Sequence, residues 1–297
     1  MFRHLVAAAM LVASLFAVPA AAFTSERIIV TVEGSGPDVI LVPGLTSNPR
    51  IYAAMVAAVP GYRYHRIQVR GFSGTAPAAN AQGDVAAAVA EELARYIRED
   101  RLVAPSLIGH SLGGTIGMML ASRHPAALGR LMVVDMVPFS GAFFGAKDGP
   151  SARAIVMGMQ ASMASNPEGA RTMMTQMIAG MVNSAAERPA VIDDARTSDP
   201  ALVARAYADL QGTDLRSELA AVTVPVTVLY VKPAMAAAVP DEQFDGLYKA
   251  QYAALRQVTL TRVPDSAHFI MLDAPTRFIA EVRQFLPAPV SGPRPAR

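Results

Sequence analysis

The sequence contains no cysteine among its 297 residues. This absence excludes thiolate nucleophiles, cysteine metal ligands and disulfides, so packing must stabilise the fold without covalent cross-links. Charge is also scarce, because Asp, Glu, Lys and Arg make up 17% of the chain and the formal net charge is only +2. The cations do not form a basic run interleaved with aromatic residues, and nothing therefore favours nucleic acid binding.

Hydrophobic residues are abundant instead, at 52% of the chain. A chain of this composition and length can bury a large core, which excludes disorder as its main state. At roughly 150 residues per domain, the length allows about two domains. Because single α/β domains with an inserted segment also reach this size, we expect one core with an insertion.

The first 22 residues have the order of features found in a secretory signal peptide. Arg3 supplies a positive charge, residues 5–18 form an apolar run, and Ala20-Ala21-Ala22 provides a small-residue cleavage site. A membrane anchor is the alternative, but it needs about 20 apolar residues, more than this run provides. We expect cleavage after Ala22, a periplasmic or secreted location, and no stable membrane span in the mature chain. The proline-rich residues 287–297 are expected to form a disordered tail.

Strand and helix patterns alternate along most of the chain. Apolar or β-branched runs bounded by turn residues predict strands at 28–32, 39–42, 62–69, 106–108, 131–134, 224–231 and 258–263. Apolar residues at helical spacing predict helices at 51–59, 85–97, 113–122 and 269–286, the second of them capped by Asp84. Continuously apolar strands are covered on both faces, so we predict an α/β fold with a doubly wound, mostly parallel sheet. Ligands of such sheets bind at the carboxyl ends of the strands.

The stretch 137–219 breaks this alternation. It contains no β-branched run and is rich in Ala, Met, Asn and Glu, which suit helices and their caps, so we predict a helical insertion between two strands. Seven of the 16 methionines lie in it. Flexible thioethers line adaptable apolar surfaces, although the near-helical spacing of these methionines fits contacts between helices equally well.

A serine stands at a sharp junction between a predicted strand and a predicted helix. The segment Gly109-His110-Ser111-Leu112-Gly113 fits the Gly-x-Ser-x-Gly nucleophile elbow in its required context. Glycines permit the strained turn and the close approach of neighbouring backbone. The turn holds the hydroxyl at the amino end of a helix, where backbone amides and the helix dipole stabilise developing negative charge. The alternative is a glycine-rich turn that serves packing alone.

These features together resemble the α/β-hydrolase superfamily, in its lidded serine esterase-like branch. The resemblance covers residues 27–286 and rests on Val42-Pro43-Gly44-Leu45 after one buried strand, Arg70-Gly71-Phe72 after the next, the elbow, and a late His268. It implies an α/β-hydrolase core in residues 23–136 and 220–286. Residues 137–219, called the lid below, would then be a helical insertion after the sixth strand of the family.

The resemblance also implies an oxyanion hole made by the backbone N–H groups of Leu45 and Leu112. Two positions depart from the pattern of most relatives. Pro43 stands where they have histidine, which leaves the Leu45 amide unaffected, and Gln68 stands where they have aspartate. We expect the second departure to change structural hydrogen bonding only.

The general base has five histidine candidates. His4 leaves with the signal peptide, His65 lies within a strand, His110 is on the turn beside Ser111, and His124 follows a helix. His268 lies on the loop after the last strand, where the superfamily keeps its base, and a neutral imidazole is suited to accept the serine proton. The resemblance therefore implies that His268 is the base.

The acid is harder to assign, because the usual position after the seventh strand of the family is empty. Residues 232–238 contain no carboxylate. A minority of the superfamily places the acid at the end of the sixth strand, where Asp135 follows an apolar run and needs a partner. We predict Asp135 as the acid, with Asp241 on a lengthened loop as the alternative and a dyad without acid as a third possibility.

The sequence thus predicts a serine hydrolase that cleaves a carboxylic ester with a hydrophobic portion through an acyl-enzyme intermediate, without metal or cofactor. Its partner would be a small-molecule ester. Four alternatives stay open: a proline-iminopeptidase-like aminopeptidase, a carbon–carbon bond hydrolase, a perhydrolase, and a non-catalytic ligand binder of the same fold. An aminopeptidase would need lid carboxylates to bind the substrate amine, and the candidates are Glu168, Glu187, Asp193 and Asp194.

Overall fold

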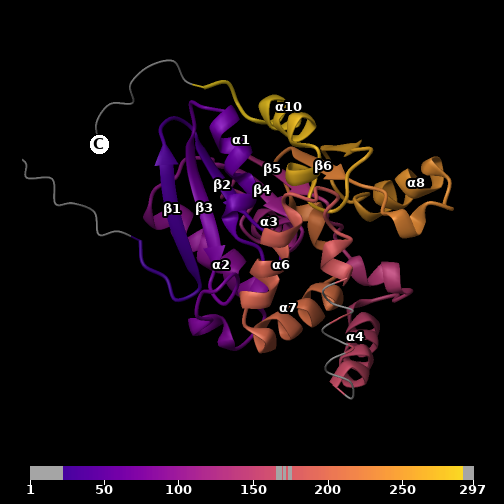
Figure 1. Cartoon of the computed structure of the whole chain (residues 1–297). Coiled ribbons are helices and arrows are strands. Elements are labelled where there is room, and N and C mark those ends of the chain that lie inside the picture. The colour runs from indigo at the N-terminus through magenta and orange to yellow at the C-terminus, as the bar shows by residue number, and fades with distance from the viewer. Residues whose placement is uncertain (1–22, 165–168, 170–171, 173–175, 290–297) are drawn as a thin grey trace, which may run out of the picture.

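A computed structural model describes residues 23–164, 169, 172 and 176–289. The described residues form one seven-stranded sheet with the order β1-β3-β2-β4-β5-β6-β7 (Figure 1). The strands are β1 (Ile28–Gly34), β2 (Asp38–Val42), β3 (Arg63–Val69), β4 (Ser106–His110), β5 (Arg130–Val134), β6 (Val226–Tyr230) and β7 (Val258–Arg262). Only β1 runs antiparallel, against β3, and every other pairing in this sheet is parallel. The predicted mostly parallel α/β sheet is confirmed.

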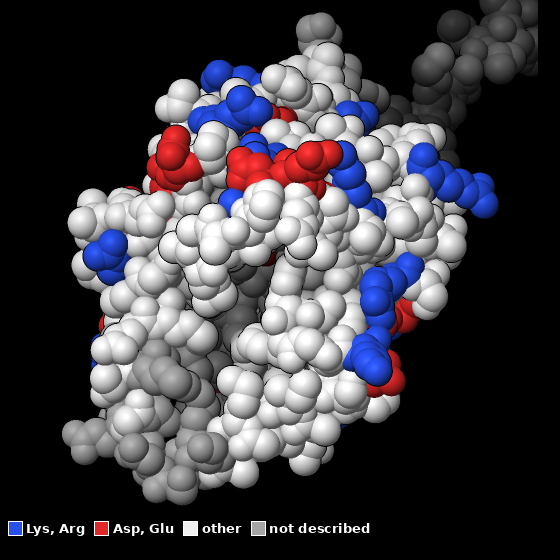
Figure 2. Space-filling view, turned by 90° about the vertical axis from the view of Figure 1, so that its right-hand side faces the viewer, with Lys and Arg blue, Asp and Glu red and all other residues white. Residues whose placement is uncertain are grey.

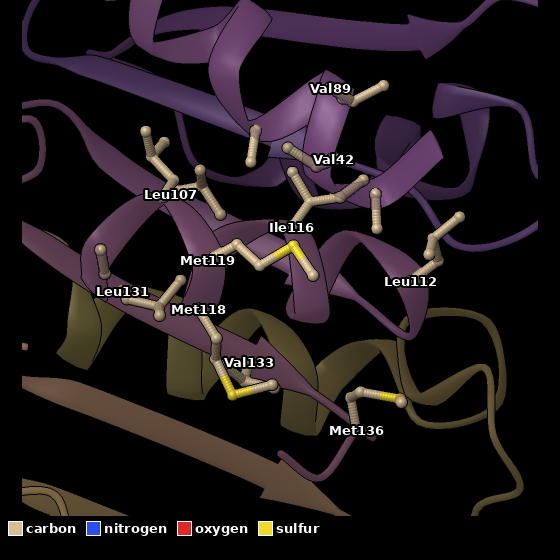
Figure 3. Close-up of a cluster of buried hydrophobic side chains, with 14 of the residues drawn as sticks. Val42, Val89, Leu107, Leu112, Ile116, Met118, Met119, Leu131, Val133 and Met136 are labelled. Carbon is tan, nitrogen blue, oxygen red and sulfur yellow. The ribbon is translucent and has the colours of Figure 1, made fainter. Parts of the chain in front are cut away.

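Alternate residues of the central strands enter two separate cores. In β2, Ile40 and Val42 face the cluster formed with α2 (Val85–Glu99) and α3 (Leu112–Arg123). Val39 and Leu41 face the opposite cluster, formed with α1 (Ala53–Ala58) and α10 (Pro275–Phe285). Figure 3 shows part of the first cluster, where side chains of α3 lie between α2 and the central strands. Because helices cover both faces, β2 and β4 are buried along their whole length.

The register of the parallel strands brings their carboxyl ends to one edge of the sheet. Val42 pairs with Gly109, His110 with Val134, and Tyr230 with Arg262. The loops that follow these strands hold Leu45, Ser111, Asp135 and His268. The predicted nucleophile, base, acid and oxyanion residues, apart from the alternative acid Asp241, therefore follow strand ends at this edge.

The lid lies between β5 and β6, and β5 is the strand that the family counts as its sixth. Its described elements are η3 (Ser140–Phe144), α4 (Gly149–Ala164), α6 (Arg188–Thr197), α7 (Pro200–Gly212) and η4 (Glu218–Ala221). Helix α4 packs against α7 and lies at the periphery of the molecule, whereas α6 lies close to the sheet (Figure 1). Residues 165–168, 170–171 and 173–175 of the lid lie outside the described residues.

Three helical segments differ from the sequence prediction. The segment predicted as one helix at 51–59 begins as a 3₁₀ turn, η1 (Pro49–Tyr52), before α1. The segment predicted at 269–286 divides into α9 (Ile270–Asp273) and α10, because Pro275 cannot donate a backbone hydrogen bond to continue the first helix. Helix α8 (Asp241–Gln251) was not predicted at all. Two further 3₁₀ turns are η2 (Ala78–Ala81) and η5 (Ala234–Ala236).

The predicted signal peptide, residues 1–22, lies outside the described residues, as do residues 290–297 of the predicted tail. Within the described part, no helix combines the length and the apolar character needed to cross a membrane.

The helix start predicted at Asp84 provides a test of the fold that is independent of function. The Asp84 carboxylate accepts a 3.0 Å hydrogen bond from the Ala87 amide at the start of α2. Replacing Asp84 with Ala removes this cap and should lower the free energy of unfolding by about 1 kcal/mol. Chemical denaturation measures the difference. Glu26→Ala, which removes an exposed acidic residue outside any helix, is the control, and equal destabilisation of both variants would contradict the capping role.

Candidate active site

Ser111 occupies a strained turn between β4 and α3. Its backbone angles are φ 53° and ψ −119°, in a region that residues with a side chain rarely adopt. The flanking glycines make room for the turn, because a Cβ at Gly109 would lie 2.2 Å from Gly113 O, and a Cβ at Gly113 would lie 2.1 Å from Val42 O. The Ser111 amide donates to Val134 O at 2.9 Å, so the turn is also fixed to the neighbouring strand. The predicted elbow is therefore formed.

The two residues predicted to supply oxyanion amides belong to segments next to this serine. Leu112 is the first residue of α3, and the amides of a first helical turn have no acceptor within their helix. The loop after β2 packs directly against the elbow, since a Cβ at Gly44 would lie only 2.9 Å from Ser111 Cβ. Leu45 follows Gly44 in this loop. The loop that carries Leu45 therefore lies against the Ser111 turn, and Leu112 follows Ser111 directly.

His268 and Asp135 meet at the same edge of the sheet. His268 Nδ1 donates to Asp135 Oδ2 at 2.6 Å. The other carboxylate oxygen, Oδ1, accepts the Val231 amide at 3.0 Å and lies 3.5 Å from the Tyr248 hydroxyl. Burial, together with the negative charge of Asp135, raises the pKa of Tyr248 well above its usual value, so this hydroxyl stays protonated. The Asp135 side chain is only 10% exposed, and this set of donors compensates its burial.

Asp241, the alternative acid, lies elsewhere. It is the first residue of α8, and its side chain is 57% exposed. Its carboxylate accepts from Lys232 Nζ at 2.8 Å and from Arg262 at 2.7 Å, and these hydrogen bonds lower its pKa. The structure therefore brings Asp135, and not Asp241, to the His268 imidazole.

His110 has a role in the site that the sequence did not indicate. Its side chain is fully buried, its Nε2 donates to the backbone O of His268 at 3.1 Å, and the two imidazole rings lie 4.5 Å apart. Burial and the neighbouring His268 lower the pKa of His110 well below its usual value, so it is neutral at pH 7. His110 therefore supports the loop of His268 without adding a competing charge.

His65, His124 and Gln68 have structural partners, whereas His4 lies outside the described residues. His65 lies between Asp38 and Tyr96 inside the sheet, and His124 contacts Glu91 at the surface. Gln68 Nε2 donates to Val69 O at 3.0 Å and to Phe72 O at 3.2 Å, which closes the turn after β3. An aspartate has no N–H to donate to these carbonyls, so the departure at Gln68 changes the hydrogen bonding of a turn.

One face of the molecule has a hollow with few charged side chains around it (Figure 2). Figure 2 shows one face of the molecule hollowed between uncharged side chains, with charged residues gathered along its upper rim. Of the lid methionines, Met157, Met159 and Met177 are exposed, Met181 packs against the second core cluster, and Met163, Met173 and Met174 have side chains outside the described set. Within the described residues, no group of three or more His, Asp or Glu is placed to hold a metal ion.

Known proteins are similar to this chain in sequence and in fold. It is 34% identical to a pimeloyl-[acyl-carrier protein] methyl ester esterase from Aeromonas hydrophila over 106 residues, which is 35% of this chain and 40% of that protein. The chain thus aligns with about two fifths of that relative's length. An esterase from Exiguobacterium antarcticum superposes with a TM-score of 0.70 at 18% identity, covering 87% of this chain and 94% of that one.

An enol-lactonase from Burkholderia xenovorans superposes comparably, with a TM-score of 0.68 at 16% identity over 87% of this chain and 95% of that one. At such identities, the two structures show a shared fold and nothing finer. The family model described as the alpha/beta hydrolase family matches residues 39–282, which include the elbow, Asp135 and His268. With this match across most of its length, and with the strand order and elbow described above, the chain belongs to the alpha/beta hydrolase family.

Proposed function

We propose that this protein is a serine hydrolase that cleaves a carboxylic ester with a hydrophobic portion. The observation on which this rests is the 2.6 Å contact between His268 Nδ1 and Asp135 Oδ2, at the same sheet edge as a strained serine elbow. Ser111 is the nucleophile, His268 the general base, and Asp135 the residue that orients the base. The amides of Leu45 and Leu112 form the oxyanion hole.

The contact with Asp135 fixes the proton of His268 on Nδ1, which leaves the Nε2 lone pair to accept the Ser111 proton. The serine oxygen then attacks the ester carbonyl, and the carbonyl oxygen gains a negative charge that the two amides stabilise. His268 passes the proton to the departing alcohol oxygen, leaving an acyl-enzyme. Water attacks the acyl group by the same route and restores the serine.

Three observations favour an ester with an apolar portion. The face that includes the hollow is largely uncharged (Figure 2), and flexible methionines of the lid lie at the surface. The similar proteins named above include two esterases and a lactonase. Substrate contacts with uncharged side chains would fit an acyl or alcohol group without charge.

An aminopeptidase is less well supported, because the lid carboxylates have other partners. Asp194 is buried and accepts from Arg50 and from the Asn48 amide, and Asp193 pairs with Arg196. Glu187 is exposed, and Glu168 lies outside the described residues. A substrate amine would have to displace Arg50 to reach Asp194. Carbon–carbon bond hydrolysis and perhydrolysis would use the same residues, and the p-nitrophenyl ester series separates the first of them from ester hydrolysis.

We also propose that the protein works in the periplasm or is secreted. Phe23, the residue after the predicted cleavage site, packs its ring against Tyr96 with centroids 4.7 Å apart, and Arg95 lies over the same ring. Cleavage after Ala22 would therefore leave a first residue that belongs to the folded body. The exported protein should begin at Phe23, which intact-mass spectrometry can test. A measured mass that includes residues 1–22 would contradict the proposal.

Ser111→Ala should abolish the hydrolysis of p-nitrophenyl esters, because no other group can form the acyl-enzyme. Hydrolysis rates on a series of p-nitrophenyl esters, from acetate to long acyl chains, should show an optimum chain length. That optimum indicates the size of the substrate pocket. The melting temperature should stay nearly unchanged, and Ser217→Ala, which alters an exposed serine, is the matched control. A fluorophosphonate probe should label the wild type at Ser111.

Turnover that survives in Ser111→Ala would refute this mechanism. A folded wild type that is labelled but hydrolyses no ester would point to peptide or carbon–carbon bond cleavage, and amino-acid anilides would then be tested. A folded wild type that is neither active nor labelled would favour the non-catalytic binder.

Asp135→Asn should reduce kcat by about 10⁴-fold, because the amide no longer holds His268 in the productive tautomer. The variant should fold, since Asn Oδ1 can still accept the Val231 amide. Asp241→Asn, at an exposed position paired with two cations, should leave kcat near the wild-type value. Steady-state kinetics of both variants show whether Asp135 or Asp241 is the acid. A large loss of kcat confined to Asp241→Asn would reverse the assignment.

A further inference from the structure

The loop that offers the Leu45 amide is a tight turn held by the lid. The Ser47 amide donates to Gly44 O at 3.2 Å, which closes a β-turn over residues 44–47. Leu45 is the second residue of this turn, and its N–H is not part of the turn's own hydrogen bond. Thr46, the third residue, has φ 64°, a conformation that favours glycine. Contacts outside the turn must therefore keep it in this shape.

Asp194 of the lid helix α6 supplies the first of these contacts. Its side chain is only 3% exposed, although it is a carboxylate. Oδ2 accepts the Asn48 amide, directly after the turn, at 3.3 Å, and also contacts the Arg50 guanidinium at 2.7 Å. Oδ1 accepts the Ser73 hydroxyl at 2.5 Å. Asp194 thus joins the loop after β2 to the loop after β3.

Ser198, which follows the end of α6, supplies the second contact. Its hydroxyl oxygen accepts the Ser73 amide at 2.9 Å and lies 3.4 Å from Thr46 O. Ser73 also has a positive φ, 48°, so both strained residues of the two loops touch the same end of the lid. Backbone bonds reinforce this junction, since the Asp199 amide donates to Gly71 O at 2.8 Å.

Stability alone does not account for a buried carboxylate at this position. Removing a charge from water costs several kcal/mol, and a well-packed apolar side chain often stabilises a fold equally well. A carboxylate, however, fixes the direction of the N–H and O–H groups that donate hydrogen bonds to it. Asp194 accepts from three donors at once, two of which belong to the two strained loops.

We propose that Asp194, supported by Ser198, is a positioning residue for the oxyanion hole. Helix α6 holds the turn of residues 44–47 so that the Leu45 amide points at the developing oxyanion. In this role, the end of the lid at Asp194 and Ser198 stays fixed during turnover. The inference rests on the proposed function, because it concerns the oxyanion hole of the same reaction.

Asp194→Asn keeps the size of the side chain but removes its charge and one acceptor oxygen. It should lower kcat on the best p-nitrophenyl ester by about 10- to 100-fold, as expected for a displaced oxyanion donor, while KM changes little. A trifluoromethyl ketone of the same chain length binds Ser111 as a tetrahedral oxyanion. Its affinity should fall by the same factor as kcat/KM, whereas a ground-state competitor such as the product acid should bind as before.

Asp209→Asn is the matched control. Asp209 is another buried lid carboxylate, paired with Arg153 of α4, and these contacts lie within the lid. It should reduce stability without changing kcat or ketone affinity. Equal kinetic effects of the two variants would overturn the proposal, because Asp194 would then act only through lid stability. If Asp194→Asn fails to fold, Ser198→Ala tests the proposal instead. Unchanged affinity of that variant for the trifluoromethyl ketone would overturn the proposal.

Activity of the wild type separates this inference from the proposed function. A wild type that hydrolyses esters through Ser111, together with an Asp194→Asn variant that matches Asp209→Asn, contradicts the positioning role alone. A wild type that hydrolyses no ester contradicts the proposed function and, with it, the positioning role.

Discussion

The site depends on the strained backbone of Ser111. A φ of 53° and a ψ of −119° are tolerated only because the chain around the turn leaves almost no room to relax. Gly109 and Gly113 face backbone atoms that cannot move aside, and Gly44 lies against the serine itself. The same crowding that strains the turn places the loop of Leu45 beside the nucleophile. The strain at Ser111 and the geometry of the proposed oxyanion hole therefore follow from the same packing.

Much of this arrangement could be predicted because local sequence determines it. Continuous apolar runs require strands covered on both faces, and this requirement predicted the parallel sheet and its active edge. The glycine spacing around Ser111 indicated the elbow, since other residues do not fit the turn. Asp135 was predicted from the resemblance, because a minority of the superfamily places its acid at the end of this strand, and from the need of such a carboxylate for a partner. The structure places His268 there.

The features that were missed depend on contacts between distant parts of the chain. Helix α8 has few apolar residues, but Phe244 and Tyr248, four residues apart, are buried, and that spacing was the available signal. Tyr248 reaches Asp135 across 113 positions of the chain, and Asp194 reaches Asn48 across 146. From sequence alone, Asp194 was grouped with exposed lid carboxylates as a possible ligand for a substrate amine. Only folding shows that it is buried against the loop after β2.

Asp135 and Asp194, the two carboxylates discussed for the site, face opposite electrostatic demands. Asp135 contacts His268, which in the proposed mechanism becomes positive during proton transfer, so the negative charge of Asp135 would lower the energy of that transition state. Asp194 lies beside the loop where the proposed mechanism places the developing negative charge, and an unpaired carboxylate there would oppose the oxyanion. Arg50, 2.7 Å from Asp194, balances that charge and remains 43% exposed, which keeps the pair partly solvated. The contribution of Asp194 is therefore one of geometry, and Arg50 is what makes a carboxylate acceptable at this position.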